Sequence, residues 1–147
     1  MTTIREQVSD FHRMIGQPIL DTPQVPPDDR ARMRASLVVE ETFELLAAIF
    51  PRAGWARLHA EVRDKIEQEE VDVNLPELAD ACADLDYVTE GTRLECGIDG
   101  APIAAEVHRT NMAKAAGPVD ASGKKRKPPG WQPPDIARLL REQGWRP

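Results

Sequence analysis

Three glutamates lie close together in the segment VVEETFELLAAIF, residues 38 to 50, which contains no lysine or arginine. At about 100° per residue, Glu40, Glu41 and Glu44 occupy one wedge of a helix whose other positions are almost all apolar. We therefore expect this helix to be buried nearly all round. Glutamates on a solvated helix normally find a cation four residues further on, but here Glu44 follows Glu40. A cation that this helix does not supply would therefore offset the repulsion between the glutamates.

A second acidic wedge lies in the segment NLPELADACADLDYVTEGTRLECG, residues 74 to 97. Glu77, Asp80 and Asp84 fall on one narrow side of a helix there. The six carboxylates of the two wedges are hard oxygen ligands of the kind that Mg²⁺ or Mn²⁺ prefers. A cluster of structural salt bridges is the alternative, and Asn74 with Glu77 also matches a capping box, in which Glu77 would only satisfy a backbone N–H.

Length, charge and cysteine content limit the kind of protein that carries these wedges. The 147 residues predict a single domain, 1–147, and the net charge of −6 argues against nucleic-acid or anionic-membrane partners. The sequence has no long apolar run and no apolar core of a signal peptide near its start. Cys82 and Cys96 form no C-x-x-C motif. We expect a cytoplasmic protein with neither a zinc site nor a disulfide framework.

Prolines and glycines divide the chain into segments with helical periodicity, and no run alternates strictly between apolar and polar residues. The predicted fold is all-α: helical hairpins form a four-helix-bundle-like core that dimerisation completes. The apolar side formed by Val39, Phe43, Leu46 and Phe50 exceeds what a lone chain would cover, which predicts a homodimer. The helices are expected at about residues 3–15, 28–50, 55–66, 75–96, 102–115 and 134–143.

The two wedges, E-E-x-x-E and then E-x-x-D, resemble the motifs of the MazG-like all-α nucleoside triphosphate pyrophosphohydrolases. The blocks DFHRMIGQP, DACADLDYVTEGT, CGID, EVHRTNMAK and GKKRKPPGWQPPD are similar to the branch of that superfamily with dUTP-hydrolysing members, and they cover nearly the whole chain. The resemblance implies a homodimer that hydrolyses a nucleoside triphosphate between its α- and β-phosphates. It also implies Mg²⁺ held by Glu40, Glu41, Glu44, Glu77 and Asp80, with Asp84 beside them.

The resemblance also indicates which residues would bind the substrate. A polyphosphate can approach the acidic wedges only with divalent metal between them, and Glu40 or Glu41 could accept the proton of the attacking water. By resemblance, Asn111, Lys114 and Lys124 are the expected nucleotide ligands and could neutralise phosphate oxygens. Asn111 and Lys114 could also be a surface amide and lysine, and a charge run such as GKKRK can be plain surface. The nucleobase needs an apolar slot with a few polar groups. The candidates for that slot are Phe11, His12, Gln17, Asp21 and Tyr87.

Other functions share some of these features. A di-iron bundle would need Glu-x-x-His, but neither His59 nor His108 follows a glutamate by three residues. A non-catalytic dimeric adaptor could use the acidic groove for a basic partner, and phosphoribosyl-ATP pyrophosphohydrolases are the closest enzymatic alternative. One departure from the expected pattern is the long, acid-rich stretch between the two wedges, residues 51–75, which puts the geometry of the hairpin in doubt.

Overall fold

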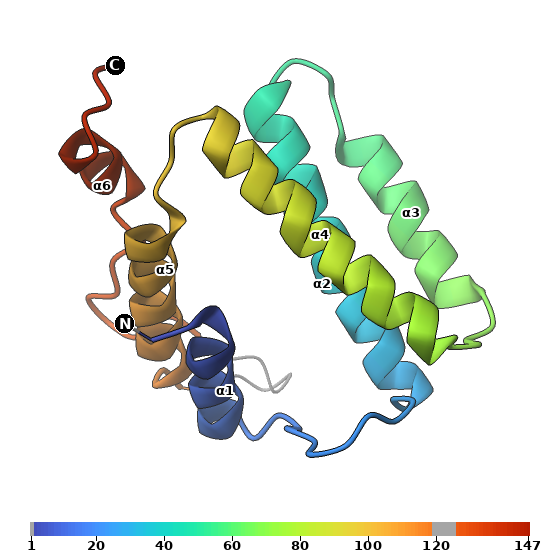
Figure 1. Cartoon of the computed structure of the whole chain (residues 1–147). Helices are drawn as coiled ribbons and strands as arrows, with labels where there is room; N and C mark the ends of the chain where they lie inside the picture. The colour runs from blue at the N-terminus through green and yellow to red at the C-terminus, as the bar shows by residue number, and fades with distance from the viewer. Residues whose placement is uncertain (1, 119–125) are drawn as a thin grey trace. The chain divides into compact units, whose positions relative to one another are not determined.

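A computed structural model describes residues 2–118 and 126–147 of the chain, and these residues form helices and connecting segments without any strand. Figure 1 shows the helices in chain order. The all-α prediction is therefore confirmed, and the predicted helix ends agree with the observed ones to within a few residues. The helices are α1 (Ile4–Ile15), α2 (Asp28–Ile49), α3 (Ala56–Gln68), α4 (Leu75–Glu95), α5 (Gly100–Ala115) and α6 (Ile136–Glu142).

The chain divides into two compact units, and α4 takes part in both. The first unit consists of residues 1–22 and 83–147, and in it α1 and α6 each pack on α5 (Figure 1). Its most buried residues are Gln7 on α1, Thr110 and Ala115 on α5, and Leu139 on α6. The core of this unit therefore lies where α1 and α6 meet α5.

Local sequence signals explain why α1 and α5 begin where they do. Thr3 and Glu6 form a reciprocal capping box at the start of α1, and Gly16 ends the helix in a left-handed conformation with φ of 69°. Asp99 caps α5, because its Oδ1 accepts a hydrogen bond of 3.0 Å from the N–H of Ala101. Short-range side-chain hydrogen bonds thus define the two helices that pack together in the first unit.

The second unit, residues 23–82, contains the hairpin of α2 and α3. Arg32 on α2 donates to the carbonyls of Ile66 and Glu69 at the end of α3, where helix carbonyls lack partners within the helix. At the other end, the ring of Phe43 stacks on His59 with 4.9 Å between centroids and meets the edge of Trp55 at 6.2 Å. Phe43 therefore lies inside the hairpin.

The long helix α2 differs from the expectation of near-complete burial, and α4 is exposed in the same way. No residue of α2 or α4 is buried in the single chain. On α2, Val38, Leu45 and Ile49 are about half exposed, while Val39, Phe43 and Leu46 are partly covered. The prediction of burial was wrong for the single chain, because a helix can be apolar on most sides and still have only one neighbour. Across the residues that the structure describes, no helix is long and apolar enough to span a membrane.

Candidate active site

The first acidic wedge lies on α2 as predicted, with all three glutamates exposed. None of the ion pairs among residues 2–118 and 126–147 involves Glu40, Glu41 or Glu44. Partial desolvation raises the pKa of the Glu41 carboxyl, and the charges of Glu44 and Glu40 add to this effect. The wedge is thus a concentration of negative charge that the described residues do not neutralise.

A cavity of about 240 Å³ opens beside this wedge, between α2 and the start of α3. Glu40 and Glu44 form its acidic side, and its other lining residues include Phe43, Trp55 and His59. His59 Nε2 is buried there without a hydrogen-bond partner among the described residues. The cavity therefore places two of the predicted metal ligands next to an aromatic wall.

The second wedge lies on the first half of α4. Glu77, Asp80 and Asp84 are exposed, and no ion pair in the described part of the chain involves them. The N–H of Glu77 donates to Asn74 Oδ1 at 3.4 Å, so Asn74 caps this helix as the sequence indicated. The Glu77 carboxylate is therefore not needed to explain the start of α4.

Within the described residues of the single chain, no three acidic, histidine or cysteine side chains are close enough together to hold a metal ion. The donor set nevertheless has the chemistry that a hard divalent cation requires. It consists of carboxylates without an ion-pair partner among the described residues, and partial desolvation, together with the charges of Glu44 and Glu40, raises the pKa of Glu41. The residues present fit such an ion, while the assembly of one complete site remains a prediction.

A second pocket, of about 260 Å³, lies where α1 packs on α5. It brings together two residues predicted to bind the substrate, Phe11 from α1 and Asn111 from α5. Most of its wall is apolar, with Gln7, Arg93, His108 and Asn111 as its polar side chains. Ligand pockets commonly combine apolar walls with a few polar groups.

The other predicted substrate residues lie outside the lining of this pocket. His12 Nδ1 is 3.0 Å from the carbonyl oxygen of Pro18, a contact that folds the segment after α1 back toward the helix. Gln17 donates its N–H to the carbonyl of His12, and Asp21 is exposed. Tyr87 is 82% exposed on α4. Lys114 is exposed near the end of α5, and Lys124 is outside the described residues.

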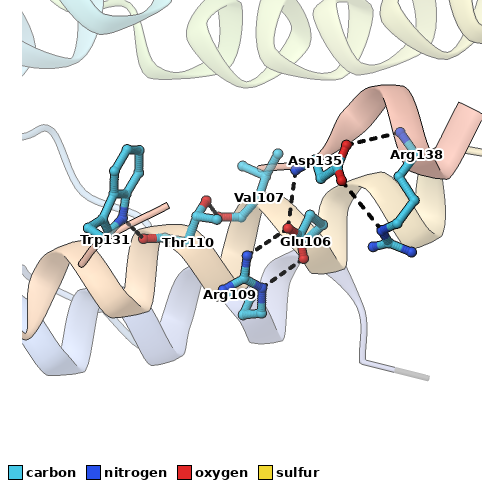
Figure 2. A network of polar contacts seen from close by, with 7 residues as sticks. All are labelled: Glu106, Val107, Arg109, Thr110, Trp131, Asp135 and Arg138. Carbon is cyan, nitrogen blue, oxygen red and sulfur yellow. Dashed lines mark hydrogen bonds and ion pairs between the residues drawn. The ribbon is translucent and has the colours of Figure 1, made fainter. Parts of the chain in front are cut away.

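The segment after the basic run returns to α5 through a polar network (Figure 2). Trp131 Nε1 donates to the Thr110 carbonyl oxygen at 3.0 Å, and the Asp135 N–H donates to Glu106 Oε1 at 3.3 Å. Glu106 also accepts two hydrogen bonds from Arg109. Hydrogen bonds from Arg109 and from the Asp135 backbone hold the pKa of Glu106 at about 2. The network attaches the C-terminal segment to the helix that carries Asn111 and Lys114.

Sequence reasoning missed Gln7, His59 and Glu106. Gln7 follows Ile4 by three residues and precedes Phe11 by four, so it lies on the apolar side of α1. A polar residue at such a position is a signal that could have been noticed. His59 has no comparable signal, because the ring it stacks on, Phe43, lies on another helix. Glu106 stands three residues before Arg109, which indicates a pair on one helix, but its contact with the Asp135 N–H joins it to a distant segment.

Comparison with known proteins agrees with this architecture. The sequence model of the PRA-PH family, phosphoribosyl-ATP pyrophosphohydrolase, matches residues 8–111. No curated protein sequence matches the chain. Among solved structures, the chain is similar to a proposed NTP pyrophosphohydrolase from Exiguobacterium sp. 255-15, with 27% identity and a TM-score of 0.65 over 97% of this chain and 98% of that one. The family match spans α2, α3 and α4, including both acidic wedges, and most of α1 and α5. The chain belongs to the phosphoribosyl-ATP pyrophosphohydrolase family, within the MazG-like superfamily, and is a pyrophosphohydrolase.

Proposed function

We propose that this enzyme hydrolyses a (deoxy)nucleoside triphosphate to the monophosphate and pyrophosphate in the presence of Mg²⁺, and that dUTP is the first substrate to test. The observation that carries the proposal is the wedge of Glu40, Glu41 and Glu44 on α2, which has no ion pair among the described residues in a chain of a pyrophosphohydrolase family. The choice of dUTP rests only on the resemblance of the sequence blocks to the branch of the superfamily with dUTP-hydrolysing members. Mn²⁺ is the expected substitute for Mg²⁺.

The proposed ligands of the ion are the two wedges: Glu40, Glu41 and Glu44 on α2, and Glu77, Asp80 and Asp84 on α4. When bound there, Mg²⁺ would offset the charge of the triphosphate and make a coordinated water more acidic. Glu40 or Glu41 would accept the proton of the attacking water, since a carboxylate can act as a general base. Asn111 and Lys114 are three residues apart on α5 and would bind phosphate oxygens from one side of that helix.

We also propose that the enzyme works as a homodimer. Val38, Leu45 and Ile49 leave an apolar row exposed on α2, and Leu78, Leu85 and Val88 leave another on α4. Exposed apolar area of this extent on long helices is typical of an interface. A second copy would supply the additional helices that the four-helix core requires.

Phosphoribosyl-ATP is the second candidate substrate, because it is the substrate named by the family whose model matches residues 8–111. It shares the triphosphate chemistry and would use the same carboxylates. It is larger on the base side, so the two candidates differ in what the substrate pocket must accept.

The deciding experiment is a panel of nucleoside triphosphates and phosphoribosyl-ATP incubated with Mg²⁺, with both products identified. Pyrophosphate and a monophosphate are expected. Reaction in ¹⁸O-labelled water should place the label in the monophosphate if the α-phosphorus is attacked. Orthophosphate as the first product would contradict the proposed cleavage, and label only in pyrophosphate would move the attack to the β-phosphorus.

A further inference from the structure

Gln7 is the most unusual polar residue of the first unit. It is only 5% exposed, and its Oε1 accepts no hydrogen bond from any described residue. A buried amide oxygen without a partner costs about 1–3 kcal/mol, so such groups normally have a role or a missing partner. Gln7 also lines the pocket between α1 and α5, where a ligand could supply the missing donor.

The rest of the pocket indicates which part of a nucleotide would lie there. Its cation, Arg93, is already paired with Glu90 at 2.8 Å, which makes the pocket a poor site for phosphate. Its volume of about 260 Å³ lies just below the usual range of about 300–1,000 Å³ for a drug-sized ligand. The pocket therefore suits an uncharged, flat part of the substrate, the base, with Phe11 among its apolar contacts.

The positions of Asn111 and Lys114 along α5 also agree with a base in this pocket. Asn111 lines the pocket, and Lys114 lies one helical turn further on, outside the pocket lining. A base held next to Phe11 would leave its phosphates toward Asn111 and Lys114, further along α5. The neutral and the charged ends of the substrate would thus contact successive turns of one helix.

We propose that Gln7 is a specificity-determining residue whose Oε1 accepts a hydrogen bond from an N–H group on the edge of the nucleobase. This inference rests on the proposed nucleotide hydrolysis and adds the residue that selects the base. The N–H group could be the ring imide of uracil or thymine, or the exocyclic amine of cytosine or adenine. A base analogue that lacks the N–H would leave the oxygen unpartnered, and the enzyme would reject it.

The first test compares the substrate found by the panel with its methylated analogue on the wild-type enzyme. The analogue is N3-methyl-dUTP if dUTP is hydrolysed, or an N,N-dimethylated nucleotide if the base carries an exocyclic amine. The loss of one neutral hydrogen bond predicts a fall in kcat/KM of about three- to tenfold, mainly through KM. Equal hydrolysis of the parent and the analogue would overturn the proposal, and this comparison does not depend on any variant folding.

The second test uses Gln7→Met, which keeps the length of the side chain but removes the acceptor. The variant should lose about three- to tenfold in kcat/KM for the parent substrate and should no longer distinguish it from the methylated analogue. Its melting temperature should not fall, because the buried oxygen that is removed has no hydrogen-bond partner among the described residues. Gln68→Met, at an exposed position on α3, is the matched control and should behave as wild type. Unchanged discrimination in Gln7→Met would overturn the proposal.

Binding measurements test the role of Gln7 separately from the proposed hydrolysis. Calorimetry with deoxyuridine and deoxycytidine 5′-monophosphates measures base recognition without turnover. Binding that weakens in Gln7→Met supports the role of Gln7 even if no triphosphate is hydrolysed. Turnover with unchanged base discrimination in Gln7→Met overturns only the role of Gln7. The absence of both binding and turnover in the wild-type enzyme overturns both proposals.

Discussion

Trp131 donates from its indole Nε1 to the carbonyl oxygen of Thr110 at 3.0 Å, which joins the C-terminal segment to the most buried turn of α5 (Figure 2). Thr110 is only 2% exposed. The ring of Trp131 also lies under the ammonium of Lys127, with Nζ 4.3 Å from the ring centroid. One side chain thus anchors the segment to the helix and contacts Lys127, the last cation of the basic run.

We predict that Trp131→Phe lowers the free energy of unfolding by about 1 kcal/mol, because the aromatic ring is largely kept while the hydrogen bond is lost. The midpoint of urea denaturation measures this change. Trp145→Phe is the control, since the Trp145 side chain is about half exposed and makes no hydrogen bond in the described part of the chain. Equal midpoints for Trp131→Phe and wild type would show that the indole N–H is not needed for the attachment.

Glu106 makes the stability of the same attachment dependent on pH. Its hydrogen bonds from Arg109 and the Asp135 backbone hold its pKa at about 2, below the ordinary 4.5. A lowered carboxyl pKa stabilises the fold fully above the unfolded value, and this stabilisation is lost as the pH falls through the folded value. The relevant window therefore runs from about pH 4.5 down to about pH 2.

The test compares the melting temperatures of wild type and Glu106→Gln across this pH window. Wild type should be the more stable above pH 4.5, and the difference should shrink toward pH 2, where Glu106 becomes protonated. Arg109, Asp135 and Arg138 are the other charged groups of this network in Figure 2, and Asp135→Asn is measured alongside to separate the contribution of Asp135. A difference that stays constant from pH 6 to pH 2 would show that Glu106 acts without its charge.

Replacing Glu41 should lower the activity of the enzyme without lowering its stability in the absence of metal. We predict that Glu41→Gln melts at the same or a higher temperature than wild type without metal, because each like-charge contact it removes costs about 0.2–0.5 kcal/mol. Mg²⁺ should raise the melting temperature of wild type, since an ion that binds only the folded state stabilises it. Chelation should abolish hydrolysis.

The comparison variant for this prediction is Glu67→Gln, an exposed glutamate on α3 away from the wedge. It should keep both the response to Mg²⁺ and full activity. Glu41→Gln should lose at least about 100-fold in kcat, the usual contribution of a general acid or base. Full activity in excess chelator would remove the metal from the reaction, and full activity of Glu41→Gln would remove this residue from the site.

The assembly prediction concerns the exposed apolar row of α2. Leu45→Glu should yield a monomer in light scattering at micromolar concentration, because a charge in an apolar interface loses its solvation on association. Val25→Glu, at an exposed apolar position outside the helices, is the control and should remain a dimer. A folded, active monomer of the wild-type protein would contradict the proposed dimer.

The helices and the two acidic wedges could be predicted from the sequence, because both depend on residues within a few positions of one another. Thr3, Asn74 and Asp99 cap their helices through hydrogen bonds that span two or three residues. The side on which Glu40, Glu41 and Glu44 lie follows from helical geometry alone. These features needed no knowledge of what packs against them.

Tertiary structure decided which residues from distant segments share a site. Phe11 and Asn111 line one pocket only because α1 packs on α5, and the same packing buries Gln7 and leaves its oxygen without a donor from the described residues. Trp131 reaches Thr110 across 21 positions of the chain, and Asp135 reaches Glu106 across 29. Burial and long-range hydrogen bonds depend on how helix surfaces fit together, and the periodicity of a single helix does not contain that information.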